Sequence, residues 1–263
     1  MHVVVIHGWK EETTELAQAI SGVLGITAFE ARQLLLGGGP TVAAGFADHQ
    51  QALMLAQKLN QSGIATMVVD AAAARSRAGY VIVRRFELTE SSLRIETGDG
   101  QRAEIPYGEI DVLLPATGIV EYPETKTVTE RKFSLGKTIL SGGIPMSKKV
   151  KHQEKVATEE RRKVLYLYTG RRQQPVVFSQ DGMIYDGLGA AMQLSRELNY
   201  TYVISELRRL SPGAAYDDRL LKRVGQVRLL GPALDPETNL DLAAEILARN
   251  LRPSPKSNDT SVP

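Results

Sequence analysis

Basic side chains are the most concentrated chemically active groups in the sequence. Seven of them lie between residues 146 and 163: Lys148, Lys149, Lys151, Lys155, Arg161, Arg162 and Lys163. Such a cluster can bind the phosphates of nucleic acid or of an anionic membrane through charge alone. No aromatic residue lies between Phe133 and Tyr166, so the segment lacks side chains on which bases could stack. We favour the other interpretation of this segment, a solvated loop or helix.

Residues with the spacing of a catalytic or metal site are sparse. The four histidines do not cluster, and the absence of cysteine excludes disulfides, thiolate metal sites and cysteine nucleophiles. Gly136-Lys137-Thr138 has the form of the end of a phosphate-binding loop, but Arg131 stands where that loop needs a glycine to wrap the phosphates. The sequence therefore predicts no catalytic residue, no metal and no cofactor.

A glycine turn after the first apolar run is a further motif that is compatible with an enzyme. The sequence His7-Gly8-Trp9 resembles the strand end that carries the oxyanion loop of α/β-hydrolases. That chemistry requires a G-x-S-x-G turn to present the nucleophilic serine, and the chain contains none. We interpret these residues as a strand end with a half-buried tryptophan.

The composition describes an ordinary globular protein. The chain has 263 residues, of which 43% are hydrophobic and 24% charged, with a net charge of +2. That charge is small for a dedicated nucleic-acid-binding protein. The sequence has no signal peptide and no apolar stretch long enough to cross a membrane, so we expect a cytoplasmic protein.

The first 72 residues predict strands and helices in the order β-α-α-β-α-β. Val3–Ile6 form an apolar, β-branched run typical of a buried strand. A helix from Thr13 or Thr14 ends at Gly25, and Thr27 with Glu30 has the spacing of a capping box that begins a second helix. A strand at 41–45, a helix capped by Asp48 and a strand at 64–69 complete the domain. Three helices can then cover a three-stranded sheet.

The glycines and apolar positions of this domain carry a resemblance to known proteins. The run from Gly25 to Leu35 is followed by a second set of positions: Pro40, Val42, Gly45, Ala52, Leu55, Leu59, Gly63, Val68 and Val69. Together they resemble the C-terminal domain of the bacterial ribosomal stalk protein, a fold shared by the N-degron adaptor of the Clp protease. Both relatives bind proteins, so the resemblance implies that this domain is a protein-binding module.

The pattern changes after residues 71–79, an alanine-rich stretch that we interpret as a linker. Residues 80–88 and 93–96 alternate apolar and polar side chains, and Gly98-Asp99-Gly100 predicts a hairpin turn. A second hairpin is expected from 176–178 to 183–185, with a strand at 164–168 before it. Helices are expected near 190–198, 202–210 and 217–224.

Part of this second region also resembles a known class. Residues 86–95, followed by the Ile105-Pro106-Tyr107 step into a further strand, resemble the opening of bacterial pleckstrin-homology-like domains. The order of elements in this region, a meander of strands followed by helices, predicts a mainly antiparallel β barrel or curled sheet closed by a helix.

The sequence thus predicts an α+β protein made of a small βααβαβ domain followed by this barrel or curled sheet with C-terminal helices. The expected divisions are these: a stalk-like domain at 1–72, a β-rich domain at 79–232 with a charged insertion at about 121–163, a helix at 236–252 and a disordered tail at 253–263. We expect a non-enzymatic adaptor or scaffold with an unknown protein partner. A phosphate-directed binder of nucleic acid or anionic membrane, and an enzyme whose site assembles only in the fold, remain alternatives.

Overall fold

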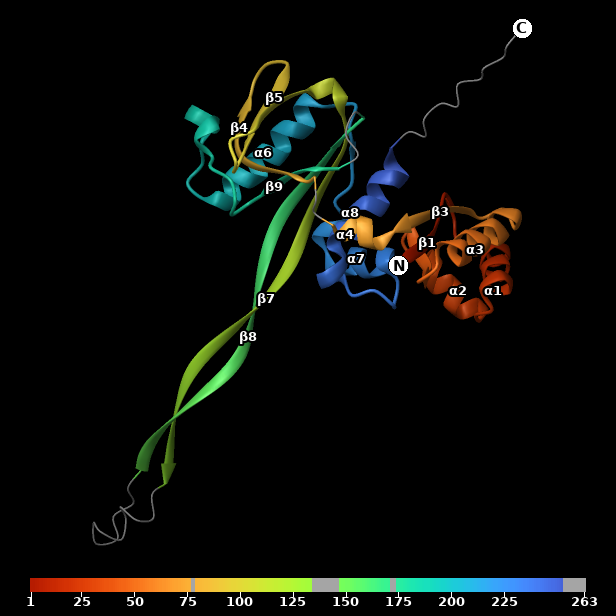
Figure 1. Ribbon diagram of the computed structural model, residues 1–263, viewed down its shortest axis with the longest axis horizontal. Helices are drawn as coiled ribbons and strands as arrows, with labels where there is room; N and C mark the ends of the chain where they lie inside the picture. Colours follow the sequence, from red (N-terminus) through yellow and green to blue (C-terminus); the bar gives the residue numbers. More distant parts are fainter. Residues whose placement is uncertain (77–78, 134–146, 171–173, 253–263) are drawn as a thin grey trace. The chain divides into compact units, whose positions relative to one another are not determined.

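A computed structural model describes residues 1–76, 79–133, 147–170 and 174–252 (Figure 1). Side chains are described outside residues 119–160. The chain divides into two units, of which the first combines Met1–Gly118 with Arg162–Pro263 and the second is Ile119–Arg161.

The first sheet has the predicted order of elements, which confirms the βααβαβ expectation. Their bounds are β1 (His2–His7), α1 (Thr14–Leu24), α2 (Ala28–Leu35), β2 (Thr41–Phe46), α3 (His49–Gln61) and β3 (Ala65–Asp70). The strands lie in the order β2-β1-β3, and both pairings are antiparallel. Local sequence fixes the helix starts, since the side chains of Thr13, Thr27 and Asp48 each accept a hydrogen bond from a backbone N–H of the first turn.

The two faces of β1 are buried in different cores. Val4 and Ile6 pack with residues of α1, α2 and α3. Val3 and Val5 point to the opposite face, since successive strand residues alternate, and they belong to a core that includes Leu242 and Leu247. The first sheet is therefore covered on one face by its own helices and on the other by residues from much later in the chain.

The alanine-rich stretch that we interpreted as a linker is a short helix, α4 (Ala71–Arg75). The Asp70 side chain caps it, and Ala71 and Ala74 are buried. The Arg75 guanidinium donates to the Asn239 side chain, with Nε 2.8 Å from Oδ1. Small side chains let this helix pack closely, which composition alone did not reveal. The expected division of the domains at this point stays a prediction.

The second sheet is mixed and open. Its strands are β4 (Val81–Leu88), β5 (Ser92–Thr97), β6 (Arg102–Pro106), β7 (Ile110–Phe133), β8 (Ser147–Thr169), β9 (Val176–Ser179) and β10 (Ala215–Tyr216). They lie in the order β10-β7-β8-β9-β4-β5-β6, and β9 is parallel to β4. The expected barrel is wrong, because β10 and β6 end this sheet without pairing with each other in the described part of the chain.

Only one of the two expected hairpins forms. β5 and β6 pair around the Gly98-Asp99-Gly100 turn as predicted. Residues 183–185 form no strand, and their one backbone link to β4 is the Ile184 N–H bonded to the Arg84 carbonyl at 2.9 Å. Both edges of β9 are already occupied, by β8 and by β4, so the returning segment has no edge to join.

The described residues of the charged insertion, 121–133 and 147–163, belong to β-strands, so the loop or helix that we favoured is wrong for residues 147–163. β7 has 24 residues and β8 has 23, and the two run side by side as long ribbons (Figure 1). β-Branched residues such as Val120, Thr125 and Thr127 are interleaved with the charges and favour an extended backbone. The density of lysine and glutamate concealed that pattern.

Helices follow the second sheet. The α-helices are α6 (Arg196–Leu210), α7 (Arg223–Leu230) and α8 (Pro236–Leu251), and the short 3-10 helices η2 (Asp186–Ala191) and η3 (Arg219–Leu221) accompany them. A further 3-10 helix, η1 (Tyr107–Glu109), lies between β6 and β7. One helix, α6, replaces the two expected at 190–198 and 202–210, and it begins where the Ser195 side chain caps the Leu198 N–H. α7 begins later than the helix expected at 217–224.

Among the described residues, none of the helices has the length and hydropathy needed to cross a membrane. The tail at 253–263, which we expected to be disordered, lies outside the described residues.

Candidate binding surfaces

The basic residues singled out in the sequence lie along one strand. Lys148, Lys149, Lys151 and Lys155 belong to β8, and their side chains are outside the described part of the structure. Arg161 and Arg162 follow on the same strand and are exposed. Whether this segment contacts phosphates stays a prediction. The Gly136-Lys137-Thr138 run lies outside the described residues.

Lys163, the last member of the basic cluster, already has an acidic partner. Its Nζ lies 2.5 Å from a carboxylate oxygen of Glu197 in the first turn of α6. This hydrogen bond, together with the lysine charge, lowers the pKa of Glu197. The ion pair connects β8 with the first turn of α6, so the charge of Lys163 has a role within the fold.

The His7-Gly8-Trp9 turn is structural in the way we interpreted it. The indole Nε1 of Trp9 donates to the Leu35 carbonyl at 3.1 Å at the end of α2. The ring covers Gly39, where an added Cβ would lie 2.6 Å from a ring carbon. Trp9 thus fixes the turn that precedes β2, and burial lowers the pKa of His7.

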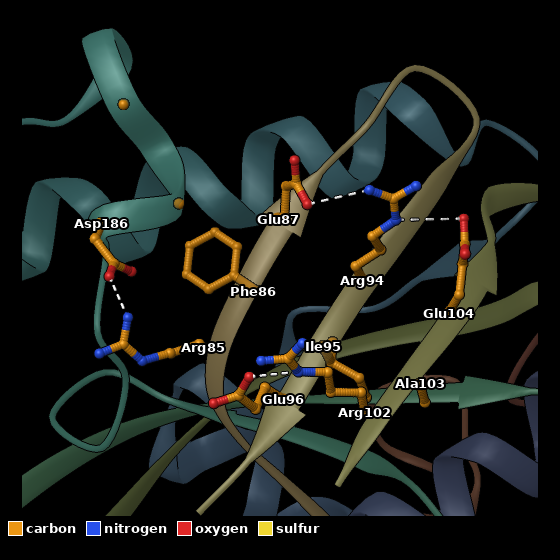
Figure 2. A pocket seen from close by; sticks show the side chains of 12 residues that line it. Arg85, Phe86, Glu87, Arg94, Ile95, Glu96, Arg102, Ala103, Glu104 and Asp186 are labelled. Carbon is orange, nitrogen blue, oxygen red and sulfur yellow. Dashed lines mark hydrogen bonds and ion pairs between the residues drawn. The ribbon is translucent and has the colours of Figure 1, made fainter. Parts of the chain in front are cut away.

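An open hollow of about 800 Å³ lies over β4, β5 and β6, and its charged side chains form two rows across the strands (Figure 2). The first row is Arg85, Glu96 and Arg102, and the second is Glu87, Arg94 and Glu104. Within the rows, Arg102 Nε lies 2.8 Å from Glu96, and Arg94 lies 3.4 Å from Glu87 and 3.6 Å from Glu104.

The two rows alternate in sign both along and across the strands. Arg85 lies opposite Glu96 in the strand register and forms its ion pair with Asp186 of η2, at 2.5 Å. Opposite charges directly across a sheet stabilise one register, because a slip of the strands would bring like charges together. Each arginine of the rows therefore has an acidic neighbour, and the four carboxylates that line the hollow outnumber its three arginines by one.

A second concave surface is apolar and is called the β2 groove here. It has a volume of about 1010 Å³. Its walls are Thr41–Gly45 of β2, Ile26, Leu34 and Leu36 from around α2, Val224 and Val227 of α7, and the segment 231–234. Four long polar side chains, Glu30, Gln33, Arg223 and Arg228, stand among them.

The wall formed by α7 is fixed by buried polar and close backbone contacts. The Gln226 amide donates to the carbonyls of Thr117 and Leu220, at 2.8 and 2.6 Å. At the end of the helix, Gly231 has φ +70°, and a Cβ there would lie 2.9 Å from the Val42 carbonyl oxygen. Only glycine permits this approach, so α7 is held against the start of β2.

The groove leaves large apolar side chains in water. Val224 is 61% exposed and Val227 is 43% exposed, one helical turn apart on α7. Single exposed apolar residues are common, but neighbouring ones that line one concave surface mark interaction sites. Mostly apolar walls with a few placed polar groups are typical of binding grooves.

A buried polar cluster lies between β8 and α8. The Tyr166 hydroxyl donates to Asp241 at 2.7 Å, and burial and the neighbouring carboxylate raise the pKa of Tyr166. Tyr168 is fully buried two residues later, and its hydroxyl has no hydrogen-bond partner among the described residues. Both side chains belong to the core that contains α8, so we assign the cluster to packing.

Sequence reasoning did not find the β2 groove. Its walls come from residues 26–45 and 223–234, which meet only in the folded chain. One signal was present, since α7 places valines at 224 and 227 between Arg223 and Arg228, but an apolar pair on a short helix is equally typical of a core.

Within the described residues, no three histidine, aspartate or glutamate side chains are grouped as metal ligands. Comparison of the chain with models of protein families, with curated proteins and with solved structures finds no match in any of the three.

Proposed function

We propose that the protein is a non-enzymatic protein–protein interaction adaptor, and that the β2 groove is its binding site. The observation that carries this proposal is the pair of exposed valines, Val224 and Val227, on the wall of an apolar groove of about 1010 Å³. Leaving both side chains in water costs free energy that burial against a partner would recover, at about 25 cal/mol per Å² of apolar surface.

The resemblance of residues 1–72 to the stalk C-terminal domain supports this proposal. Both relatives of that fold bind proteins, and the groove uses α2 and β2 of the same domain. A fold supports a function only when a site is present on it. Here the site combines that domain with α7, which lies outside residues 1–72.

The paired arginines over β4, β5 and β6 also favour the β2 groove as the binding site. Each arginine there has an acidic partner, so the arginines that line the hollow are not available to bind an anionic ligand. The apolar groove is the better candidate surface.

A pull-down from native lysate of the source cells tests the proposal. The baits are the full chain, the double variant Val224→Asp/Val227→Asp, and Leu194→Asp as a matched control. Leu194 is fully exposed, at 103%, and lies outside the groove, so its change adds the same kind of charge elsewhere.

We expect a stoichiometric protein that is retained by the wild type and by Leu194→Asp and is lost from the double variant. Nuclease treatment should leave the capture unchanged. Capture that is equal for all three baits, or that disappears with nuclease, would contradict the proposed use of the groove and direct attention to the basic strand β8.

A further inference from the structure

The β2 groove follows the free edge of a strand. β2 is the outermost strand of the first sheet, because β1 lies on one side of it only. Five consecutive residues, Thr41–Gly45, line the groove. Since neighbouring side chains point to opposite faces, a consecutive run can line a groove only along the strand's edge. The backbone N–H and C=O groups of that edge therefore face the groove.

Edge strands are normally protected against pairing with other chains, and the two sheets differ in this respect. β6 ends the second sheet with Arg102, Glu104 and Pro106, and charges and proline both discourage an added strand. β2 reads Thr-Val-Ala-Ala-Gly-Phe and has neither. The edge of β2 is therefore unprotected by charge or proline, and it carries the apolar groove.

Two features limit where an added strand could pair. Gly231 approaches the Val42 carbonyl oxygen and occupies that end of the edge. A bulge follows, since Val5 pairs with Val42 but Val4 pairs with Ala44, which leaves Ala43 as the extra residue. Regular pairing resumes over Ala44–Phe46, and in the described structure we find no hydrogen bond from this stretch to a segment other than β1.

The positive charge of Arg228 at the Thr41 end of the groove indicates that the ligand carries a negative charge. Arg223 is paired with Glu237 at 2.6 Å, and Glu30 accepts the Thr27 N–H at 2.8 Å in its capping box. Arg228 lines both the groove and a hollow of about 90 Å³ beside Gly37, and it has no ion pair among the described residues. A guanidinium in this position suits a carboxylate.

We infer that the groove binds an extended, apolar peptide segment of a partner protein, which adds as a strand along Ala44–Phe46 and places a carboxylate against Arg228. This inference rests on the proposed function and adds the conformation and charge of the ligand. An amphipathic helix fits less well, because its backbone groups are bonded internally and would leave the β2 edge unpaired. A second copy of this chain would place β2 against β2 and supply no carboxylate from that strand.

The test is selection from a phage-displayed library of random 12-residue peptides on the full-length protein. We expect enriched peptides in which apolar residues alternate and an acidic residue stands at a fixed distance from them. A synthetic peptide of the enriched sequence should raise the hydrogen-exchange protection of the Ala44–Phe46 amides. That readout distinguishes strand addition from contact through side chains alone.

Matched variants locate the contacts. Arg228→Glu should lower the affinity for the synthetic peptide by about tenfold or more, because it replaces an attractive charge with a repulsive one. Lys222→Glu makes the same change outside the groove and should leave the affinity within about twofold. Val224→Asp should abolish binding, and Leu194→Asp should not.

The outcomes separate this inference from the function on which it rests. Peptides with helical spacing that need Val224 but leave the β2 amides unprotected would overturn strand addition and keep the groove as a binding site. Equal binding to wild type and Arg228→Glu would overturn the carboxylate contact. Enriched peptides whose binding is unchanged by Val224→Asp would overturn the inference altogether. A dimer of this chain that prevents peptide binding would do the same. The pull-down would still decide the proposed function.

Discussion

Tyr166 and Tyr168 lie two residues apart on β8, and both are buried against the core that contains α8. Their hydroxyl groups differ in one respect. Tyr166 donates to Asp241 at 2.7 Å, whereas the Tyr168 hydroxyl has no hydrogen-bond partner in the described structure. A buried hydroxyl stabilises the fold only when it is hydrogen-bonded, and otherwise its desolvation is a cost.

We therefore predict opposite results for the same substitution. Tyr166→Phe should lower the free energy of unfolding by about 1.5 to 3 kcal/mol, since it removes a hydrogen bond to a carboxylate. Tyr168→Phe should leave it unchanged within about 0.5 kcal/mol or raise it. Urea unfolding of the two variants measures both, and equal losses would contradict the difference in bonding.

A second prediction at this scale concerns the capping box of α2. The Thr27 N–H and hydroxyl both donate to Glu30, which lowers the pKa of this carboxyl below 4.5. Because the folded-state pKa is the lower one, the contribution of Glu30 is present above pH 4.5 and is lost as the pH falls through the folded pKa.

Glu30→Gln should accordingly flatten the fall in stability between about pH 5 and about pH 3, measured by urea unfolding. Glu12→Gln, at an exposed position before α1, serves as the control. A pH profile for Glu30→Gln that is parallel to that of the wild type would show that the cap contributes no proton-linked stability.

At the scale of elements, local signals decided what could be predicted. Caps and glycine stops mark each helix of the first domain, and every element there was predicted. The same signals could not show that β9 pairs with β4, because residues 81–82 and 176–177 are far apart in sequence and no local pattern links them. Because that pairing was not known, we expected residues 183–185 to form a strand and the sheet to close as a barrel. The groove was missed for the same reason, since its walls are remote in sequence.

The register of β4, β5 and β6 gives a prediction that belongs to these strands. Arg94 lies at the centre of the second charged row, between Glu87 and Glu104. Arg94→Glu should destabilise the protein by roughly 1 kcal/mol more than Arg94→Gln, which removes attraction without adding repulsion. The difference should shrink in 1 M salt, where charges are screened beyond about 3 Å. A difference that salt does not change would exclude charge as its cause.

At the scale of the molecule, one core connects the first sheet with the end of the described chain. Val3, Val5, Val42 and Val69 share it with Leu229, Leu230 and the buried face of α8. Composition predicted a buried core but could not show that two regions separated by the whole second sheet would share it. The core of the first domain therefore includes residues outside 1–72, the range from which its fold was predicted.

This shared core predicts joint unfolding. Leu247→Ala, at a fully buried position in α8, should destabilise the protein by about 2 to 5 kcal/mol. Trp9, the only tryptophan, reports on the first domain by fluorescence, and circular dichroism reports on the whole chain. Both transitions should move together. A tryptophan transition that stays in place would show that the first domain unfolds by itself.

The two faces of β1 also differ in when they can be covered during synthesis. The residues that cover Val4 and Ile6 end at 68, so all of them are synthesised before the second sheet. The face of Val3 and Val5 is covered by residues that include 229–248. For most of translation this second apolar face therefore lacks the residues that cover it, which makes it a surface for a chaperone of the nascent chain.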